Sequence, residues 1–485
     1  MTPRKWLGIC VLACAASAHA ETKWIHMQSP NFEVFSGAGE RETRDTLRYF
    51  ERVRDFFLQK SQRLPRKPVP VYVVIFGSEK EFAPYRFNEF ATAYYQAGAD
   101  RDYIVLSKPG EQTARVATHE YVHLIARHDG SKLPPWMGEG LAELYSTFES
   151  VGDKVLVGGV IVGRLQALNS DKWVPLSTIL AADQNSPYYN EKNKAGNLYN
   201  EGWALVHMLQ LTPEYGPKFT PLFEAITSGT PSVEALEKTY GKPVSEIEKD
   251  LQLYIRGDRF RVFQVPMKLD KIKDAYPASP AAMFDVKLAL VNLTNRPGAD
   301  QETQRKLEEL KREDPKRPEP WAGLAYLDWR RQNVTSAVEN FSQAYTLGDR
   351  SAKLLWDYGR LAQNSRPEDA VKALTELVAL EPQNKDARIE LAGGHMSAKH
   401  PEEALAVLKP VGNVTPEQAP RFFYIKAFAQ MQTGDLDGAR ASAGIMSQYA
   451  IDASGSSARG TTGILCCRVA APVNFKCATS GSSDV

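Results

Sequence analysis

The chain has 485 residues, of which 43% are apolar and 24% charged, so it is long enough for two or three domains with hydrophobic cores. Its 59 Lys and Arg residues nearly balance its 58 Asp and Glu residues. This balance argues against a nucleic-acid-binding protein and against a strongly cationic membrane-surface protein. After the N-terminal segment no stretch is apolar for the ~20 residues that a spanning helix needs, so we expect no transmembrane segment.

Residues 1–20 have the features of a secretory signal peptide. Arg4 and Lys5 precede a short apolar run, and residues 18–20 have the small-x-small form of a cleavage site. We therefore expect an exported protein, either periplasmic or secreted. Cys14 follows Val-Leu-Ala, which is a poor lipoprotein box, so a lipid anchor there is disfavoured.

The remaining cysteines, Cys466, Cys467 and Cys477, lie in a final segment (451–485) that is rich in Ser, Gly, Thr and Ala. This composition predicts a disordered tail, in which a metal site or cross-link at the cysteines is the less favoured alternative. The body of the mature chain therefore offers neither a disulfide nor a thiolate ligand for zinc.

The first hundred residues alternate strand and helix patterns. Segments 32–37 and 69–76 predict strands, 40–59 has the apolar spacing of a helix, and 91–107 predicts two strands joined by a turn. These elements indicate a small mixed sheet with helices. Residues 115 to about 260 are expected to be mostly helical, ending in an extended linker at 259–266.

The stretch HEYVH places His119, Glu120 and His123 in the pattern H-E-x-x-H. Residues i and i+4 share one face of a helix, so the two histidines can bind one metal ion. Glu120 lies one step around the helix, where it can take a proton from a water on that metal. The alternative is two exposed histidines on an ordinary helix.

A third ligand is expected from WMGEGLAELY, which follows a proline-rich turn. It places Glu139 and Glu143 four residues apart on one helical face. One glutamate can complete a zinc site, and the other can accept a hydrogen bond from the free N–H of a ligand histidine. We assign Glu139 as the ligand and Glu143 as the hydrogen-bond acceptor.

HEYVH followed by LPPWMGEGLAELY resembles the gluzincin zinc metallopeptidases, in particular exported bacterial peptidases with tetratricopeptide repeats behind the catalytic domain. The resemblance covers roughly residues 25–260. It implies an α+β zincin-like domain (21–265) with a mixed sheet, the H-E-x-x-H helix and a helical C-terminal subdomain. It also implies one zinc ion per chain, with His119, His123 and Glu139 as ligands and Glu120 as catalytic base.

The segment YNEGWALVHML resembles the Y-E-K-G-F-A-L-L segment of aminopeptidase-N-like gluzincins, whose tyrosine stabilises the oxyanion. The resemblance implies this role for Tyr199, which we expect to open a helix after a polar loop at 185–197. The chain has no G-x-M-E-N segment, which in those enzymes helps to bind the free amine of the substrate. An endopeptidase is therefore preferred to an aminopeptidase.

Residues 280–450 predict an all-α solenoid of about five tetratricopeptide repeats. Ala337, Phe341 and Ala344 fit the second helix of one repeat. The small residue at 337 recurs at intervals of 33, 34 and 35 residues. Such repeats bind peptides or partner proteins.

The chain is thus expected to be a zinc peptidase that acts on a peptide or protein substrate, with a possible protein partner on its repeats. A catalytically inactive scaffold that works through the repeats is the alternative, and hydrolysis of a non-peptide amide or ester is a third possibility. Two other histidines have plainer readings: His128 as a helix-end residue and His207 as a core residue.

Overall fold

The structure is a computed structural model that describes residues 23–60, 71–86, 91–96, 101–128, 132–170, 172–183, 185–190, 192–257, 259–267, 276–296 and 298–452. The expected signal peptide, with Cys14, and nearly all of the expected tail lie outside these residues. The chain divides into two units, Met1–Val286 and Lys287–Val485.

A six-stranded mixed sheet forms the first half of unit 1. Its strand order is β4-β5-β3-β2-β1-β9, so β4 and β9 are the edges. The strands β2, β3 and β5 run parallel, whereas β4 pairs antiparallel with β5, and β1 pairs antiparallel with β2 and β9. The bounds are β1 Ile25–Gln28, β2 Phe32–Ser36, β3 Val71–Ile75, β4 Ala93–Gln96, β5 Tyr103–Leu106 and β9 Ser279–Pro280.

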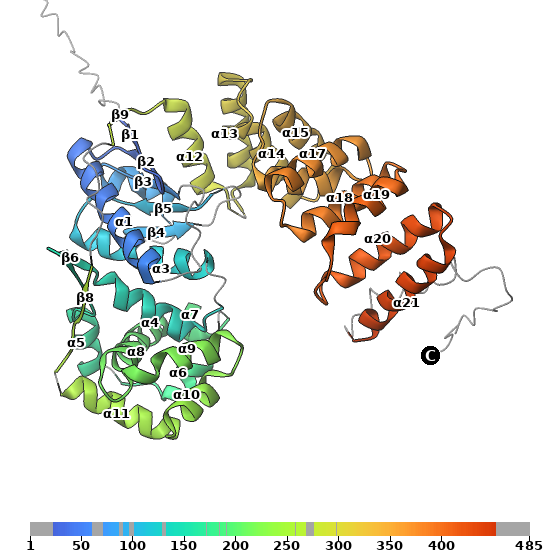
Figure 1. Cartoon of the computed structure of the whole chain (residues 1–485). Coiled ribbons are helices and arrows are strands. Elements are labelled where there is room, and N and C mark those ends of the chain that lie inside the picture. The colour runs from blue at the N-terminus through green and yellow to red at the C-terminus, as the bar shows by residue number, and fades with distance from the viewer. Residues whose placement is uncertain are drawn as a thin grey trace, which may run out of the picture. The chain divides into compact units, whose positions relative to one another are not determined.

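Two helices pack against this sheet because each presents an aromatic face to it. Phe32 of β2 contacts Phe50 of α1 (Glu40–Lys60) and Tyr121 of α3 (Glu111–His128), with ring centroids 5.6 Å apart in both pairs. All three rings are fully buried. Helix α3, which lies beside the sheet in Figure 1, carries H-E-x-x-H, so the ring contact fixes the motif to the sheet. The short helices α2 (Glu79–Phe82) and η1 (Ala83–Tyr85) follow β3.

The second half of unit 1 is a helical subdomain around α8, whose Trp203, Leu205 and Leu209 are fully buried. Its helices are α4 Pro135–Ser146, α5 Val162–Ser170, α6 Leu176–Ala181, α7 Pro187–Asn190, α8 Lys192–Leu211, η2 Gly216–Lys218, α9 Phe219–Thr227, α10 Ser232–Tyr240 and α11 Val244–Arg256. The segment 185–197, expected as a polar loop, is therefore largely helical. It contains no proline after 187, so nothing stops α8 from beginning before Tyr199.

A small second sheet was not anticipated from the sequence. It consists of β6 (Glu149–Val151), β7 (Lys154–Val157) and β8 (Phe263–Pro266) in the order β6-β7-β8, all antiparallel. The segment 259–266, expected as an extended linker, is extended at 263–266, but there it forms β8, which pairs with β7 along its whole length. Similarly, β9 joins the edge of the large sheet, so unit 1 continues to Val286 instead of ending near 265.

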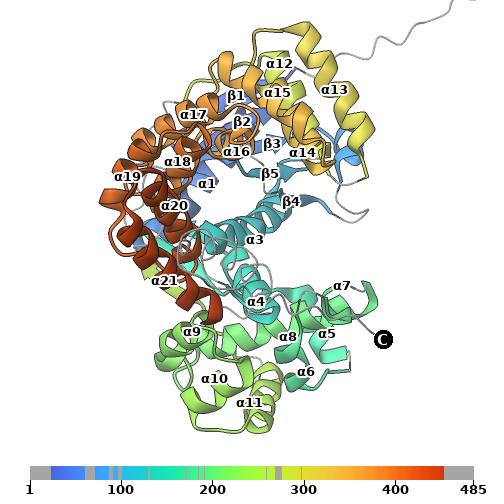
Figure 2. The same cartoon turned by 90° about the vertical axis from the view of Figure 1, so that its right-hand side faces the viewer.

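Unit 2 is a series of antiparallel helix pairs, as the repeat pattern predicted. Figures 1 and 2 show the successive pairs side by side. The alanines that define the period, Ala337, Ala370, Ala404 and Ala439, are all fully buried because neighbouring helices approach closely there. The helices are α12 Met283–Thr294, which begins in unit 1, α13 Asp300–Glu313, α14 Glu319–Arg330, α15 Val334–Thr346, α16 Ala352–Ala362, α17 Pro367–Leu380, α18 Lys385–Ser397, α19 Pro401–Leu408, η3 Lys409–Val411, α20 Ala419–Gln432 and α21 Leu436–Asp452.

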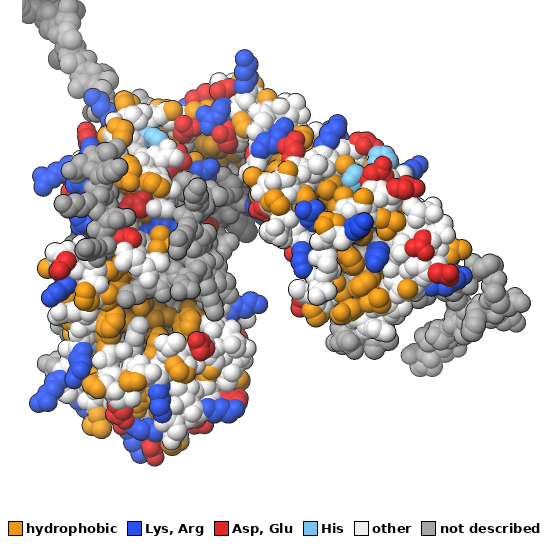
Figure 3. Space-filling view, viewed as in Figure 1, with side chains coloured by type: hydrophobic (Ala, Val, Ile, Leu, Met, Phe, Trp, Pro, Cys, Tyr) orange, Lys and Arg blue, Asp and Glu red, His pale blue; other side chains and the backbone are white. Residues whose placement is uncertain are grey.

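Side chains of both charges are interspersed over the face of the molecule in Figure 3. This distribution agrees with the formal net charge of +1. Among the described residues, no helix has the length and apolar character needed to cross a membrane.

Candidate metal centre

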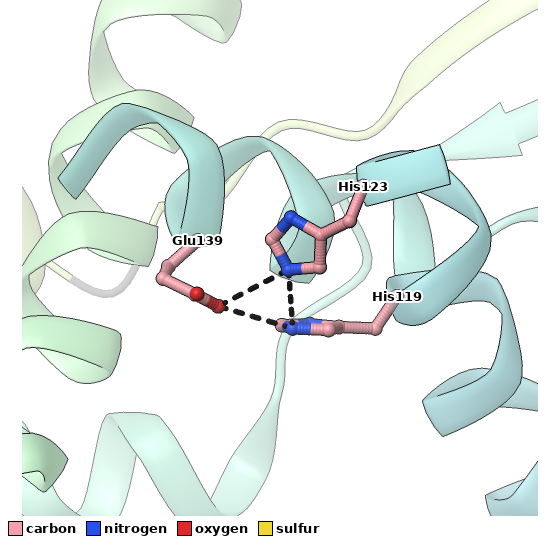
Figure 4. Close-up of side chains that lie close together, drawn as sticks. All are labelled: His119, His123 and Glu139. Atoms are coloured by element: carbon pink, nitrogen blue, oxygen red, sulfur yellow. Dashed lines mark hydrogen bonds and ion pairs between the residues drawn. The ribbon is translucent and has the colours of Figure 1, made fainter. Parts of the chain in front are cut away.

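His119, His123 and Glu139 converge on one point between α3 and α4 (Figure 4). The His119 Nε2 lies 3.1 Å from the Glu139 Oε2 and 3.2 Å from the His123 Nε2. The His123 Nε2 lies 3.4 Å from the same carboxylate oxygen. Within the described part of the chain, these three residues form the one group of His, Cys, Asp or Glu side chains close enough together to hold a metal ion.

The spacing of these three atoms fits zinc. Zinc binds imidazole nitrogen and carboxylate oxygen at about 2.0–2.2 Å, so two ligand atoms at tetrahedral positions lie about 3.3 Å apart. The three observed separations, 3.1, 3.2 and 3.4 Å, all agree with this value. Two imidazoles and one carboxylate also form a donor set that leaves the fourth position of a catalytic zinc open.

Glu143 sits one helical turn after Glu139 and holds the other side of His119. Its Oε1 lies 3.2 Å from the His119 Nδ1, and it also accepts a hydrogen bond from Arg164. Because the Nδ1–H donates to this carboxylate, the Nε2 is the nitrogen that would turn its lone pair to a metal ion once its own proton has left. The sequence placed Glu143 in this role but gave no indication of Arg164.

Charge in the centre is balanced around His119. Burial lowers the pKa of His119, but its hydrogen bonds to the Glu139 and Glu143 carboxylates together raise it more strongly, to about 10. Burial raises the pKa of Glu143, yet His119 and Arg164 hold it at about 2. The two buried carboxylates are thus balanced by the protonated His119 and by Arg164, and a metal ion would take the place of the proton on the His119 Nε2.

Glu120 faces the same region from α3 without joining the three ligands. Its Oε2 accepts a hydrogen bond from the backbone N–H of Tyr95 in β4, at 3.2 Å. Burial is the largest influence on the Glu120 carboxyl and raises its pKa. A raised pKa makes a carboxylate a better proton acceptor near neutral pH, as a general base requires.

Tyr199 lies beside His119. Its ring centroid is 6.3 Å from that of His119, and the Arg164 guanidinium lies over the Tyr199 ring at 5.4 Å. The structure therefore brings Tyr199 to the same site as the H-E-x-x-H helix, although it occupies the third turn of α8 instead of its start. Two nearby tyrosines, Tyr188 and Tyr189, are the alternative candidates for the hydroxyl donor. Tyr188 packs partly buried against the core, and the Tyr189 side chain lies outside the described residues.

Two glycines bring α4 and α8 together at this site. A Cβ on Gly140 would meet the Gly202 carbonyl oxygen at 2.5 Å, and a Cβ on Gly202 would meet the Trp136 carbonyl oxygen at 2.9 Å. Only glycine allows backbones this close. Gly140 directly follows Glu139, and Gly202 follows Tyr199 by three residues, so the crossing sets the positions of the Glu139 and Tyr199 side chains.

Two further histidines, His207 and His128, were expected to have structural positions. His207 is fully buried, and its ring nitrogens bond the Gly158 carbonyl at 2.9 Å and the Tyr254 hydroxyl at 2.7 Å. It is a core histidine with both nitrogens satisfied. His128 is the last residue of α3, but its side chain lies outside the described residues.

Glu201, two residues after Tyr199, is a buried carboxyl that the sequence did not single out. Its Oε1 accepts from the Val174 N–H at 2.9 Å, while its Oε2 is buried and has no hydrogen-bond partner. Burial raises the pKa of Glu201 to about 7. Because the folded state holds the proton more tightly than the unfolded chain, ionisation of Glu201 opposes folding.

We expect Glu201→Gln to stabilise the protein at high pH only. Below about pH 4.5 the carboxyl is neutral in both states, and the parent loses this advantage as the pH rises through 7. The raised pKa of Glu201 corresponds to a free energy of unfolding that is roughly 2–3 kcal/mol lower for the parent than for the variant at pH 8. Urea unfolding of the parent and the variant at pH 5 and pH 8 measures the effect. Exposed Glu246, replaced by Gln, is the control; equal differences at both pH values would contradict the expectation.

A tetratricopeptide repeat family model matches residues 361–427, which lie wholly within unit 2. The helical unit therefore carries tetratricopeptide repeats. No curated protein matches the chain.

Solved repeat proteins are similar to part of the chain. YrrB, described as a TPR protein with an unusual peptide-binding site, shares 15% identity over 36% of this chain and 90% of its own, with a TM-score of 0.33. PilF of Pseudomonas aeruginosa shares 20% identity over 39% of this chain and 82% of its own, with a TM-score of 0.28. MamA of Desulfovibrio magneticus RS-1 shares 16% identity over 35% of this chain and 95% of its own, with a TM-score of 0.29.

Proposed function

We propose that the protein is a zinc-dependent peptidase with a gluzincin-like, zincin-type catalytic domain in unit 1 and a peptide- or protein-binding repeat domain in unit 2. The observation that carries the proposal is the convergence of His119, His123 and Glu139 at separations of 3.1–3.4 Å. Glu143 on the far side of His119 adds support, because structural hydrogen bonds of this kind orient histidines that bind metal.

The residues around the centre have complementary roles in hydrolysis of an amide. Zinc, when bound, supplies Lewis-acid polarisation of the scissile carbonyl and lowers the pKa of water. Glu120 takes one proton from the attacking water as the new C–O bond forms. It then gives that proton to the nitrogen as the C–N bond breaks, so the products are a carboxylic acid and an amine. Tyr199 donates a hydrogen bond to the carbonyl oxygen as negative charge develops there.

An extended peptide suits the surface next to Glu120. Strand β4 is an edge of the large sheet, and its Tyr95 N–H points toward Glu120. An edge strand offers main-chain donors and acceptors to a peptide that lies alongside it. This favours a peptide over a small amide or ester. The absence of a G-x-M-E-N segment from the sequence favours endopeptidase over aminopeptidase activity.

Metal analysis and digestion test the proposal together. The purified mature chain is expected to hold one zinc ion, and His123→Ala to lose most of it because two ligands bind zinc poorly. A peptide library should be cut by the parent, and not by the parent with chelator. Stoichiometric zinc at unchanged affinity in His123→Ala would rule out the ligand assignment. A zinc-loaded parent that cuts no peptide would rule out the peptidase.

A second candidate is an exported scaffold that works through its repeats and has lost catalysis. The match of residues 361–427 to the tetratricopeptide family is consistent with it, because such repeats act by binding, but it is equally consistent with the peptidase. In either case export rests on the signal-like features of residues 1–20. A scaffold would keep partner binding when Glu120 or His123 is replaced, and it would show no turnover in the digest.

A further inference from the structure

Arg164 of α5 contacts three residues of the candidate metal centre at once. One terminal nitrogen donates to the Glu143 carboxylate, and the other donates to the Asn200 Oδ1 at 3.0 Å. Its guanidinium also lies over the Tyr199 ring, at 5.4 Å from the centroid. Arg164 thus joins α5 to α4 through Glu143 and to α8 through Asn200 and Tyr199.

The link to Glu143 continues to the metal position. The Glu143 Oε1 lies 3.2 Å from the His119 Nδ1, and the opposite ring nitrogen is the one directed at Glu139. A carboxylate that can rotate would hold the imidazole less firmly. The guanidinium restricts that rotation because its planar fork donates in fixed directions.

The link to α8 has a separate consequence. Asn200 is the residue after Tyr199, so a guanidinium that hydrogen-bonds Asn200 and also lies over the Tyr199 ring restricts the tyrosine. A guanidinium can do both because its donors are spread over one plane, whereas a lysine ammonium is a single point charge.

We propose that Arg164 is a positioning residue of the metal centre, which couples the orientation of ligand His119 to the helix that carries Tyr199. The proposal rests on the proposed zinc site. It assigns Arg164 no contact with substrate. Its effect on zinc is transmitted through Glu143, so removing Arg164 should change zinc affinity only while Glu143 is present.

Zinc affinity of the full mature chain, measured by competition with a chelating dye, tests this coupling. Arg164→Met should weaken zinc binding about 10-fold, and Glu143→Ala about 10- to 100-fold, as for groups that orient a ligand histidine. The double variant should match Glu143→Ala within about 2-fold, because both changes break one chain of contacts. Gln166→Ala, at an exposed position of α5, is the control and should bind like the parent.

Arg164→Lys separates position from charge. It keeps the cation but cannot donate to both Glu143 and Asn200, so weakened zinc binding in this variant supports the fork as the cause. Cobalt(II) substituted for zinc should show altered visible absorption in both Arg164 variants, since the bands report ligand geometry. If Arg164→Met does not fold, Arg164→Lys carries the same comparison.

Two results would overturn the coupling. One is zinc affinity within about 2-fold of the parent in both Arg164 variants. The other is effects of Arg164→Met and Glu143→Ala that multiply in the double variant. A parent chain that binds no zinc would instead refute the proposed metal site itself, so the two failures are distinguishable.

Discussion

Replacing Glu120 with glutamine is expected to lower kcat by about 10²- to 10⁴-fold while zinc stays bound, as is usual for loss of a general base. Glutamine has nearly the same shape, and its carbonyl oxygen can still accept the Tyr95 N–H that Glu120 now accepts at 3.2 Å. The amide cannot take a proton from water near neutral pH. The loss should therefore appear in kcat, with fold and metal content unchanged.

Zinc analysis, circular dichroism and single-turnover digestion of a fluorescent peptide measure these three properties. Glu149→Gln, an exposed glutamate at the start of β6, is a matched control and should keep parental turnover. Near-parental turnover in Glu120→Gln would show that another group accepts the proton. Loss of zinc in this variant would show that Glu120 helps to hold the metal, which the three-ligand assignment does not allow.

Replacing Tyr199 with phenylalanine is expected to lower kcat by about 10²- to 10³-fold with little change in KM. The ring keeps its place, with its centroid 6.3 Å from that of the His119 ring and 5.4 Å from the Arg164 guanidinium carbon. Only the hydroxyl is lost. A donor that acts on the developing oxyanion stabilises the transition state more than bound substrate, so substrate affinity should hardly change.

Steady-state kinetics of Tyr199→Phe, with zinc content and thermal unfolding as checks, measure the effect. Tyr188→Phe is the control, since Tyr188 is the neighbouring tyrosine that packs against the core. Equal activity in Tyr199→Phe would assign the donor elsewhere. A fall in kcat for Tyr188→Phe alone would move the role to that residue.

Periodicity and spacing were sufficient for much of the fold. The repeat interval at Ala337, Ala370, Ala404 and Ala439 predicted the helical pairs of unit 2, because a small residue must recur wherever two helices touch. Strands β2, β3, β4 and β5 were visible as alternating or β-branched runs. Strands β1, β6, β7, β8 and β9 were not predicted. Strands β4 and β5 are equally short, but a turn signal between them marked them as a pair.

The candidate ligands could be read from the sequence because their geometry is local. His119 and His123 share a helical face at i and i+4, as do Glu139 and Glu143, so the fold had only to bring two helices together. A role for Tyr199 came from resemblance, and the structure brings it within 6.3 Å of His119. The two histidines and the two glutamates thus follow from helical spacing alone, which the sequence shows directly.

Only the tertiary structure brought Arg164, Gly202 and the Tyr95 backbone to the centre. Each comes from a different element, and none stands at a recognisable spacing from the H-E-x-x-H motif. Their places depend on how closely α4 crosses α8 and on which strand lies at the sheet edge. Such contacts arise from packing between segments distant in sequence, on which local periodicity carries no information.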